Sequence, residues 1–410
     1  MDRKISTAYL RIGMYVSKLD RPWVQTPFLL QGFFIDDETT ISKLVKYCDF
    51  VYIDTNLGIK ADMYFEFSEG TQTKQSLTTN KQVEGILETG KKAVDYTDKS
   101  TTVEELPVAK AAFEKASECV ARIMEHDFHK GKLDIVTVKS AVEPILESMI
   151  RNSDAFMWLS KMQSYDTYSY QHSLQNCALG IAFGRHLGLN KRELNILAMG
   201  LLLMDVGKIK LPKELLTKNA PLTAAETMIM RKHVAFTVEI LRHTKGIDEH
   251  VINIALTHHE RYDGSGYPNG LIGVQAPAYG RMAAIIDCYD SMITSTPYRE
   301  AIPEHKALQN IYNLRGKSFQ QELVEQFIQC MGVYPTGSLV ELSSGAVGAI
   351  LSQNTQQKLK PKVLMLLDEN KTPYKKRVVF DLTKQDEIPL HIAKSLENNS
   401  YGVDMKQIRF

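Results

Sequence analysis

The sequence predicts a mainly helical protein with a small α+β unit at the N-terminal end and a short β-rich appendage at the C-terminal end. Apolar residues recur at helical spacing from about residue 103 to about residue 330. Before residue 65, β-like runs alternate with turns, and beyond Gly332 short β-branched runs are separated by Gly, Pro or Asn. At 410 residues, the chain is long enough for two or three domains.

Composition narrows the class of protein. The chain is 44% hydrophobic and 24% charged, which is typical of a soluble protein. Its 49 basic and 48 acidic residues give a net charge of +1, so charge offers no argument for binding a nucleic acid polymer. Because the sequence has no apolar run of about 18 residues and no signal-peptide core, we expect no membrane insertion and a cytoplasmic location. The five cysteines have no paired spacing and are expected to be free thiols.

The distribution of apolar and polar residues along the chain predicts four segments. Residues 1–65 contain the β-like runs TAYLRIGMYVSKL, FLLQGFFIDD and DFVYIDT and the helical run ISKLVKYC, and are expected to form the small α+β domain. Residues 66–104 are polar and poor in aromatic side chains, which predicts a flexible linker. Residues 105–345 are expected to form the helical domain. Residues 346–410 are expected to form the β-rich appendage, with strands to about Leu382 and a short helix after it.

Two amphipathic helices are expected between Val103 and Met162, in VAKAAFEKASECVARIM and VKSAVEPILESMI. His126 and His129 lie three positions apart near the end of the first. That spacing can chelate a metal, but lysines nearby and the absence of a carboxylate pattern favour a solvated helix end.

The stretch from Leu201 to Pro268 holds most of the groups able to bind a metal or a phosphate. One carboxylate and three imidazoles occur in ordered succession: Asp205, His233, His258 and His259. This donor set suits a divalent ion such as iron, manganese or zinc. Thr223 and Glu226 form a capping box that predicts the start of the helix carrying the first histidine. An adjacent His-His pair is a weak signal alone, so the ordered series is what favours a metal site.

Two more residues extend the series, His172 in YSYQHSLQN and Asp287 in RMAAIIDCYDSM. Together with the segment DVGK and the motif HHERYDGSGYPNGL, this order resembles the HD-GYP family, a branch of the HD metal-dependent phosphohydrolases. The resemblance covers about residues 150–345. Residues 1–65 also resemble the small domain of unknown function often found ahead of HD-GYP domains, a looser match.

The resemblance implies a helical HD-type bundle that hydrolyses cyclic di-GMP in bacterial second-messenger signalling. One metal would be held by His172, the residue at position 204, Asp205 and Asp287, and the other by His233, His258 and His259, with Asp205 bridging. Two cations can neutralise the charge that develops on a phosphodiester. Asp205 and Lys208 would be catalytic, Lys208 would also bind the scissile phosphate, and Tyr267 would shape the nucleotide pocket or a partner surface.

The sequence departs from the family at three positions. The defining histidine of the HD pair is Met204, and a thioether is a weak ligand for iron, manganese or magnesium. The arginine expected before Pro-Tyr is Thr296, with Arg299 as the substitute for binding substrate. Tyr168 stands where three-metal members have a glutamate. We therefore expect one or two divalent ions, iron or manganese, and reduced activity.

Three functions follow. The first is a cyclic di-GMP phosphodiesterase with an incomplete first metal site. The second is a non-catalytic signalling protein that binds nucleotide or one metal and recruits a partner, such as a diguanylate cyclase, through the face formed by the GYP motif. The third is a nucleotidase or general phosphohydrolase of the wider HD superfamily, which the intact GYP motif disfavours.

Overall fold

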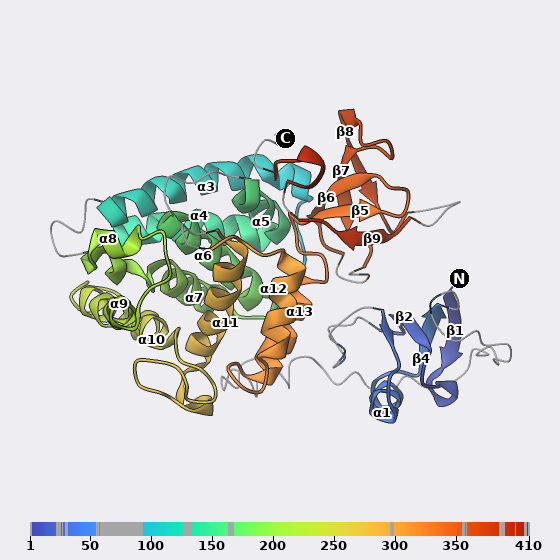
Figure 1. The fold of residues 1–410 in the computed structure, drawn as a ribbon, viewed down its shortest axis with the longest axis horizontal. Coiled ribbons are helices and arrows are strands. Elements are labelled where there is room, and N and C mark those ends of the chain that lie inside the picture. Colours follow the sequence, from blue (N-terminus) through green and yellow to red (C-terminus); the bar gives the residue numbers. More distant parts are fainter. Residues whose placement is uncertain are drawn as a thin grey trace.

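The structure, a computed structural model, describes residues 2–21, 32–54, 93–125, 133–162, 168–295, 299–354, 359–384, 390–397 and 399–405, together with Thr26, Phe28, Leu57, Gln357 and Ile408. These residues form a mainly helical body with a small antiparallel sheet in the N-terminal region and another near the C-terminus (Figure 1). The predicted fold class is therefore confirmed. None of the helices in these ranges is long and apolar enough to cross a membrane.

The N-terminal unit is a four-stranded antiparallel sheet with one helix. Its elements are β1 (Asp2–Ser6), β2 (Tyr15–Leu19), β3 (Phe33–Phe34), α1 (Glu38–Tyr47) and β4 (Phe50–Asp54), in the sheet order β1-β4-β2-β3. Helix α1 begins where the Asp37 side chain accepts a hydrogen bond from the Thr40 amide, as an N-cap does. Leu44 of α1 is buried in the same apolar core as Ile5 and Val51.

Both helices predicted between Val103 and Met162 are present, but a third helix follows them, so the predicted number was wrong. The three helices are α3 (Thr102–Glu125), α4 (Ile135–Arg151) and α5 (Ser153–Met162). The break is at Asn152, whose amide donates to Ser148 O at the end of α4 and whose side chain accepts from the Ala155 amide of α5 at 3.1 Å. One short polar side chain thus ends one helix and begins the next. His126 and His129 lie outside the described residues.

The predicted linker, 66–104, is described only from residue 93 onward. There the Val94 amide donates to Gly188 O at 2.8 Å, and the Tyr96 hydroxyl donates to Leu189 O at 2.8 Å. Asp98 forms an ion pair with Arg185 at 2.7 Å. This end of the predicted linker is therefore packed against the helical body, and α3 already begins at Thr102.

The remaining helices form the body that carries the predicted site. They are α6 (Tyr168–His186), α7 (Lys191–Leu203), η4 (Val206–Lys210), α8 (Lys213–Leu216), α9 (Ala224–Arg242), α10 (Glu249–Thr257), α11 (Ala278–Ile293), α12 (Glu304–Asn313) and α13 (Gln321–Met331). The predicted capping box at the start of α9 is confirmed. The Glu226 amide donates to the Thr223 hydroxyl at 3.3 Å, and the Thr223 amide donates to the Glu226 carboxylate at 2.7 Å.

Close packing between helices fixes where the site residues lie. A Cβ atom at Gly200 of α7 would overlap the side chain of Ile254 on α10, so these two helices can approach only because position 200 is glycine. Helix α7 ends just before Asp205, and α10 ends just before His258. The contact between the two helices therefore sets the distance between these two polar groups.

The C-terminal sheet is antiparallel, with strand order β8-β7-β6-β5-β9. Its strands are β5 (Leu339–Leu342), β6 (Val347–Ser352), β7 (Lys362–Leu367), β8 (Pro373–Asp381) and β9 (Ile392–Ser395). The sheet thus begins at Leu339, before the predicted boundary at residue 346. A strand, and the 3-10 turn η6 (Ser400–Gly402), stand where a short helix was predicted, because Ile392 is buried and pairs with Leu342 of β5.

Asp154 of α5 joins the helical body to this sheet. Its carboxylate accepts hydrogen bonds from the Thr336 hydroxyl at 2.7 Å and from the Gln353 amide at 3.0 Å. Burial raises the pKa of Asp154 to about 6, which the two donated hydrogen bonds oppose.

We predict that Gly200→Ala destabilises the protein by about 1 to 3 kcal/mol, because the added methyl group overpacks the contact between α7 and α10. Chemical denaturation measures this change. Ile254→Ala should be destabilising alone, yet the double variant should be more stable than the sum of the two single effects predicts, by about 1 kcal/mol or more. Additive effects would contradict this account of the contact.

Candidate metal centre

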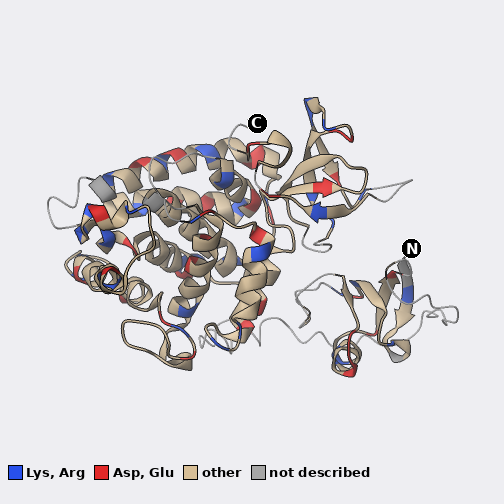
Figure 2. Ribbon diagram, viewed as in Figure 1, with Lys and Arg blue, Asp and Glu red and all other residues tan. Residues whose placement is uncertain are grey.

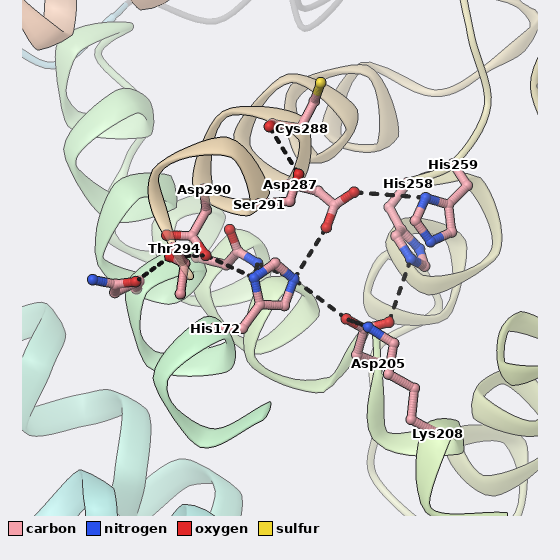
Figure 3. Close-up of polar contacts among 12 residues, drawn as sticks. His172, Asp205, Lys208, His258, His259, Asp287, Cys288, Asp290, Ser291 and Thr294 are labelled. Carbon is pink, nitrogen blue, oxygen red and sulfur yellow. Dashed lines mark hydrogen bonds and ion pairs between the residues drawn. The ribbon is translucent and has the colours of Figure 1, made fainter. Parts of the chain in front are cut away.

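All six residues predicted to bind metal lie together in the helical body. Figure 3 shows five of them, His172, Asp205, His258, His259 and Asp287. The six come from α6, from the turn after α7, from α9, from the end of α10 and from α11, and form two groups that share Asp205. One group is Asp205, His233, His258 and His259, and the other is His172, Asp205 and Asp287. Within each group the possible ligand atoms lie within 4.8 Å of one another. Spacing of this kind is what an ion held by several side chains requires.

Asp205 lies between the two groups. Its Oδ1 is 3.2 Å from His233 Nε2 and 3.8 Å from His258 Nε2. Its Oδ2 is 3.4 Å from His172 Nε2 and 2.6 Å from Lys208 Nζ. The two oxygens of one carboxylate therefore face different sets of nitrogen atoms.

The surroundings of Asp205 keep it ionised. Burial alone raises the pKa of this carboxyl, but the charge of Lys208 and contacts with the imidazoles of His172 and His233 outweigh burial and hold the pKa well below its usual range. Asp287 behaves alike, since its contact with His172 and the neighbouring imidazoles outweigh burial and lower its pKa. Both carboxylates are thus anionic, as metal ligands must be.

Hydrogen bonds to the backbone fix two of the imidazoles. His233 Nδ1 donates to Met230 O at 2.7 Å, and His258 Nδ1 donates to Ala255 O at 2.8 Å. The Nε2 atoms of both rings then face Asp205, and in the neutral ring of His258 this atom carries the lone pair. This is the arrangement that second partners of ligating histidines usually impose.

The buried polar atoms of the cluster test whether a cation fits. Asp205 Oδ1, His233 Nε2 and His258 Nε2 are buried and have no hydrogen-bond partner of good geometry among the described residues. Lone pairs that face one another away from water are costly unless a positive charge lies between them. The donor set therefore fits a divalent cation.

Burial also keeps two of the imidazoles neutral. It lowers the pKa of His258 to about 4, and it lowers the pKa of His259 well below its usual value, with the neighbouring His258 acting in the same direction. At neutral pH both rings are therefore unprotonated. A neutral imidazole is the form that binds a metal.

Asp290 holds His172 in place, and the sequence analysis missed it. Its Oδ2 accepts from His172 Nδ1 at 2.7 Å, so His172 Nε2 faces Asp287 Oδ1 at 3.1 Å (Figure 3). A carboxylate three residues after Asp287 lies on the same helix face, and that spacing could have identified it. Asp290 is fully buried.

Met204 is fully buried in the apolar core of the helical body. It caps the end of α7 directly before Asp205. The group of Asp205, His233, His258 and His259 has four possible protein ligands, whereas the group of His172, Asp205 and Asp287 has three.

Glu260 shapes the loop that carries the GYP motif, and it too was missed. The buried carboxylate accepts hydrogen bonds from the Asn269 amide at 2.8 Å and from the Leu271 amide at 3.0 Å. A Cβ atom at Gly266 would overlap the backbone of Glu260, so this close turn needs glycine. The Tyr267 ring then stacks on His259, with ring centroids 4.7 Å apart. Tyr267 thus lies against one side of the cluster of candidate metal ligands, and this side is called the Tyr267 wall below.

The remaining predicted positions are described less fully. Arg299 is exposed. Burial raises the pKa of Cys288, the neighbour of Asp287, to about 11, and the charge of Arg299 acts in the opposite direction. Thr296 lies outside the described residues. Tyr168 is the first residue of α6, but its side chain is not described.

Comparison with known proteins gives two family matches. Residues 151–323 match the HD domain, and residues 2–137 match a domain of unknown function, DUF3391. The second match extends past the predicted boundary at residue 65 and includes α3.

Curated relatives and one solved structure are also similar. The chain is 28% identical to cyclic di-GMP phosphodiesterase PA4108 of Pseudomonas aeruginosa, over 92% of this chain and 89% of that protein. It is 34% identical to a cyclic di-GMP phosphodiesterase of Thermotoga maritima, over 42% of this chain and 47% of that protein. The structure of Bd1817, an HDG"Y"P protein from Bdellovibrio bacteriovorus, aligns over 80% of this chain and 98% of that one, with 17% identity and a TM-score of 0.45.

We predict that His259→Ala lowers the metal content of the purified protein and abolishes any hydrolysis with it, because one of four clustered donors is lost. Metal affinity should fall by at least about tenfold. Elemental analysis after reconstitution measures the content. His243→Ala, which changes an exposed histidine at the end of α9, is the matched control and should bind metal normally, as should His126 and His129 variants. Unchanged metal in His259→Ala would refute the assignment.

Proposed function

Because the chain is an HD-domain protein of the HD-GYP type with a DUF3391 domain ahead of it, we propose that it is a metal-dependent phosphodiesterase that hydrolyses cyclic di-GMP. One observation carries the proposal: two groups of imidazoles and ionised carboxylates share a single buried aspartate, with a lysine beside it. This is the donor arrangement of a centre that acts on phosphate esters.

The metal would be a divalent transition ion, iron or manganese, in one or two copies. The group of Asp205, His233, His258 and His259 would hold one ion, and the group of His172, Asp205 and Asp287 would hold the other. Mixed imidazole and carboxylate donors suit these ions better than thiolate-preferring metals. When bound, such ions polarise a phosphodiester and lower the pKa of a water molecule.

The chain itself would position the substrate. Lys208 is partly exposed and lies beside Asp205, so its ammonium group can bind the scissile phosphate at the cluster. Tyr267, stacked on His259, would bound the nucleotide pocket. Burial raises the pKa of the Tyr267 hydroxyl, which stays protonated and can donate a hydrogen bond. Arg299, as the sequence predicts, would add a second contact to phosphate.

A second function is a non-catalytic signalling protein, and Met204 is the observation that favours it. This position lacks an imidazole, and its side chain is buried among apolar neighbours. In that case the cluster would hold one ion or nucleotide, and the GYP face would bind a protein such as a diguanylate cyclase. The cytoplasmic location expected from the sequence stays a prediction.

We predict that Met204→His increases the bound metal towards two ions per chain and raises cyclic di-GMP turnover by about tenfold, which corresponds to about 1.4 kcal/mol. The reason is that an imidazole beside Asp205 adds a fourth donor to the weaker group. Elemental analysis and a turnover assay under anaerobic conditions measure both quantities.

Met199→His is the matched control, because Met199 is likewise a buried methionine and lies in the last turns of α7, just before Met204. It should add neither metal nor turnover. Met204→His with Thr296→Arg tests whether phosphate binding limits the rate. If the unmodified protein and both Met204 variants bind metal and none hydrolyses cyclic di-GMP, the non-catalytic function replaces the enzymatic one.

A further inference from the structure

Arg231 contacts the ring of Tyr267, which stacks on one of the candidate metal ligands. It lies on α9, two residues before His233, and its side chain is exposed. Its guanidinium carbon is 4.6 Å from the centroid of the Tyr267 ring, and the same ring lies 4.7 Å from the ring of His259. One aromatic side chain therefore separates this cation from a member of the metal cluster.

The charge of Arg231 is not neutralised by any carboxylate of the described residues. Three lysines of η4 and of the segment before α9 do have carboxylate partners. Lys208 pairs with Asp205 at 2.6 Å, Lys210 with Glu239 at 2.9 Å, and Lys218 with Glu226 at 2.6 Å. Arg231 is thus a cation that an aromatic ring positions and that has no described anionic partner.

The contact with Tyr267 leaves the best donors of Arg231 available. A guanidinium group over an aromatic ring interacts with the face of the ring, and this interaction does not use its N–H groups as hydrogen-bond donors. Those N–H groups form a planar fork that matches two oxygens of a phosphate. Because the ring of Tyr267 already positions this side chain, it loses less conformational freedom when an anion binds than an arginine without such a contact would lose.

We propose that Arg231 binds the second, non-scissile phosphate of a cyclic dinucleotide whose first phosphate lies at the metal cluster. This inference rests on the proposed function. A cyclic dinucleotide carries two phosphodiester groups in one ring, each with a single negative charge. Lys208 beside Asp205 matches one of them, and Arg231 at the Tyr267 wall matches the other. Arg231 therefore favours substrates with two linked phosphates over substrates with one.

The test compares two substrates and three variants of the metal-loaded, full-length protein. Cyclic di-GMP has two phosphates, whereas bis(p-nitrophenyl) phosphate has one. The variants are Arg231→Ala, Arg231→Lys and the matched control Lys232→Ala, which removes the neighbouring exposed cation of α9 that has no described ion pair. For each protein, kcat and KM, the calorimetric Kd for cyclic di-GMP, the metal content and the melting temperature are measured.

In Arg231→Ala, the KM and Kd for cyclic di-GMP should rise about tenfold or more, the range expected when a charge-assisted hydrogen bond is lost. The loss of kcat/KM for bis(p-nitrophenyl) phosphate should be several times smaller, so the preference for the dinucleotide falls. The KM and Kd of Arg231→Lys for cyclic di-GMP should lie between those of the unmodified protein and those of Arg231→Ala. Lysine keeps the positive charge but lacks the planar pair of N–H donors. Lys232→Ala should resemble the unmodified protein.

Two results overturn the inference while the proposed function stands. Equal losses on both substrates, with a lower melting temperature or metal content, would show that Arg231 only supports the Tyr267 wall. Equal effects of Arg231→Ala and Lys232→Ala would show a general effect of surface charge. A metal-loaded, unmodified protein that cleaves the one-phosphate ester and neither binds nor hydrolyses cyclic di-GMP overturns the proposed function, and the inference with it.

Discussion

The buried carboxylate of Asp205 is the interaction on which the rest of the site depends. A carboxylate removed from water is costly unless cations or hydrogen-bond donors surround it. Here the ammonium group of Lys208 supplies part of that compensation, and a divalent cation held with the imidazoles of His172 and His233 would supply the rest. These three side chains come from three different elements. The helices that bring these side chains together are therefore arranged around one charge.

Apolar packing gives this arrangement its precision. The missing side chain at Gly200 lets α7 approach α10, and Gly207 lets η4 lie against α9, where the Gly207 amide donates to the Thr237 hydroxyl at 2.8 Å. Side chains at the ends of tightly packed helices have little freedom to move apart. The polar cluster is thus positioned by contacts that contain no polar ligand atoms.

The sequence predicted those features that have a local or ordered signature. The capping box of Thr223 follows from residue type and spacing, and the clustering of imidazoles and carboxylates follows from a succession of rare donors. The Asn152 break, the strand at Ile392 and the role of Glu260 were not predicted. Each depends on a partner that is visible only in three dimensions: a second helix, the edge of β5, or a loop that folds back on its own start.

The two backbone bonds to Glu260 also affect the thermodynamics of binding. They hold the loop after His259 in shape through the chain's own groups, and the stack of Tyr267 on His259 adds to this. A ligand that enters beside Tyr267 meets a wall that is already ordered, so little conformational entropy is lost at that wall on association. The loop is thus a preorganised surface. Little of the favourable free energy of its contacts with a ligand would be offset by the cost of ordering the loop.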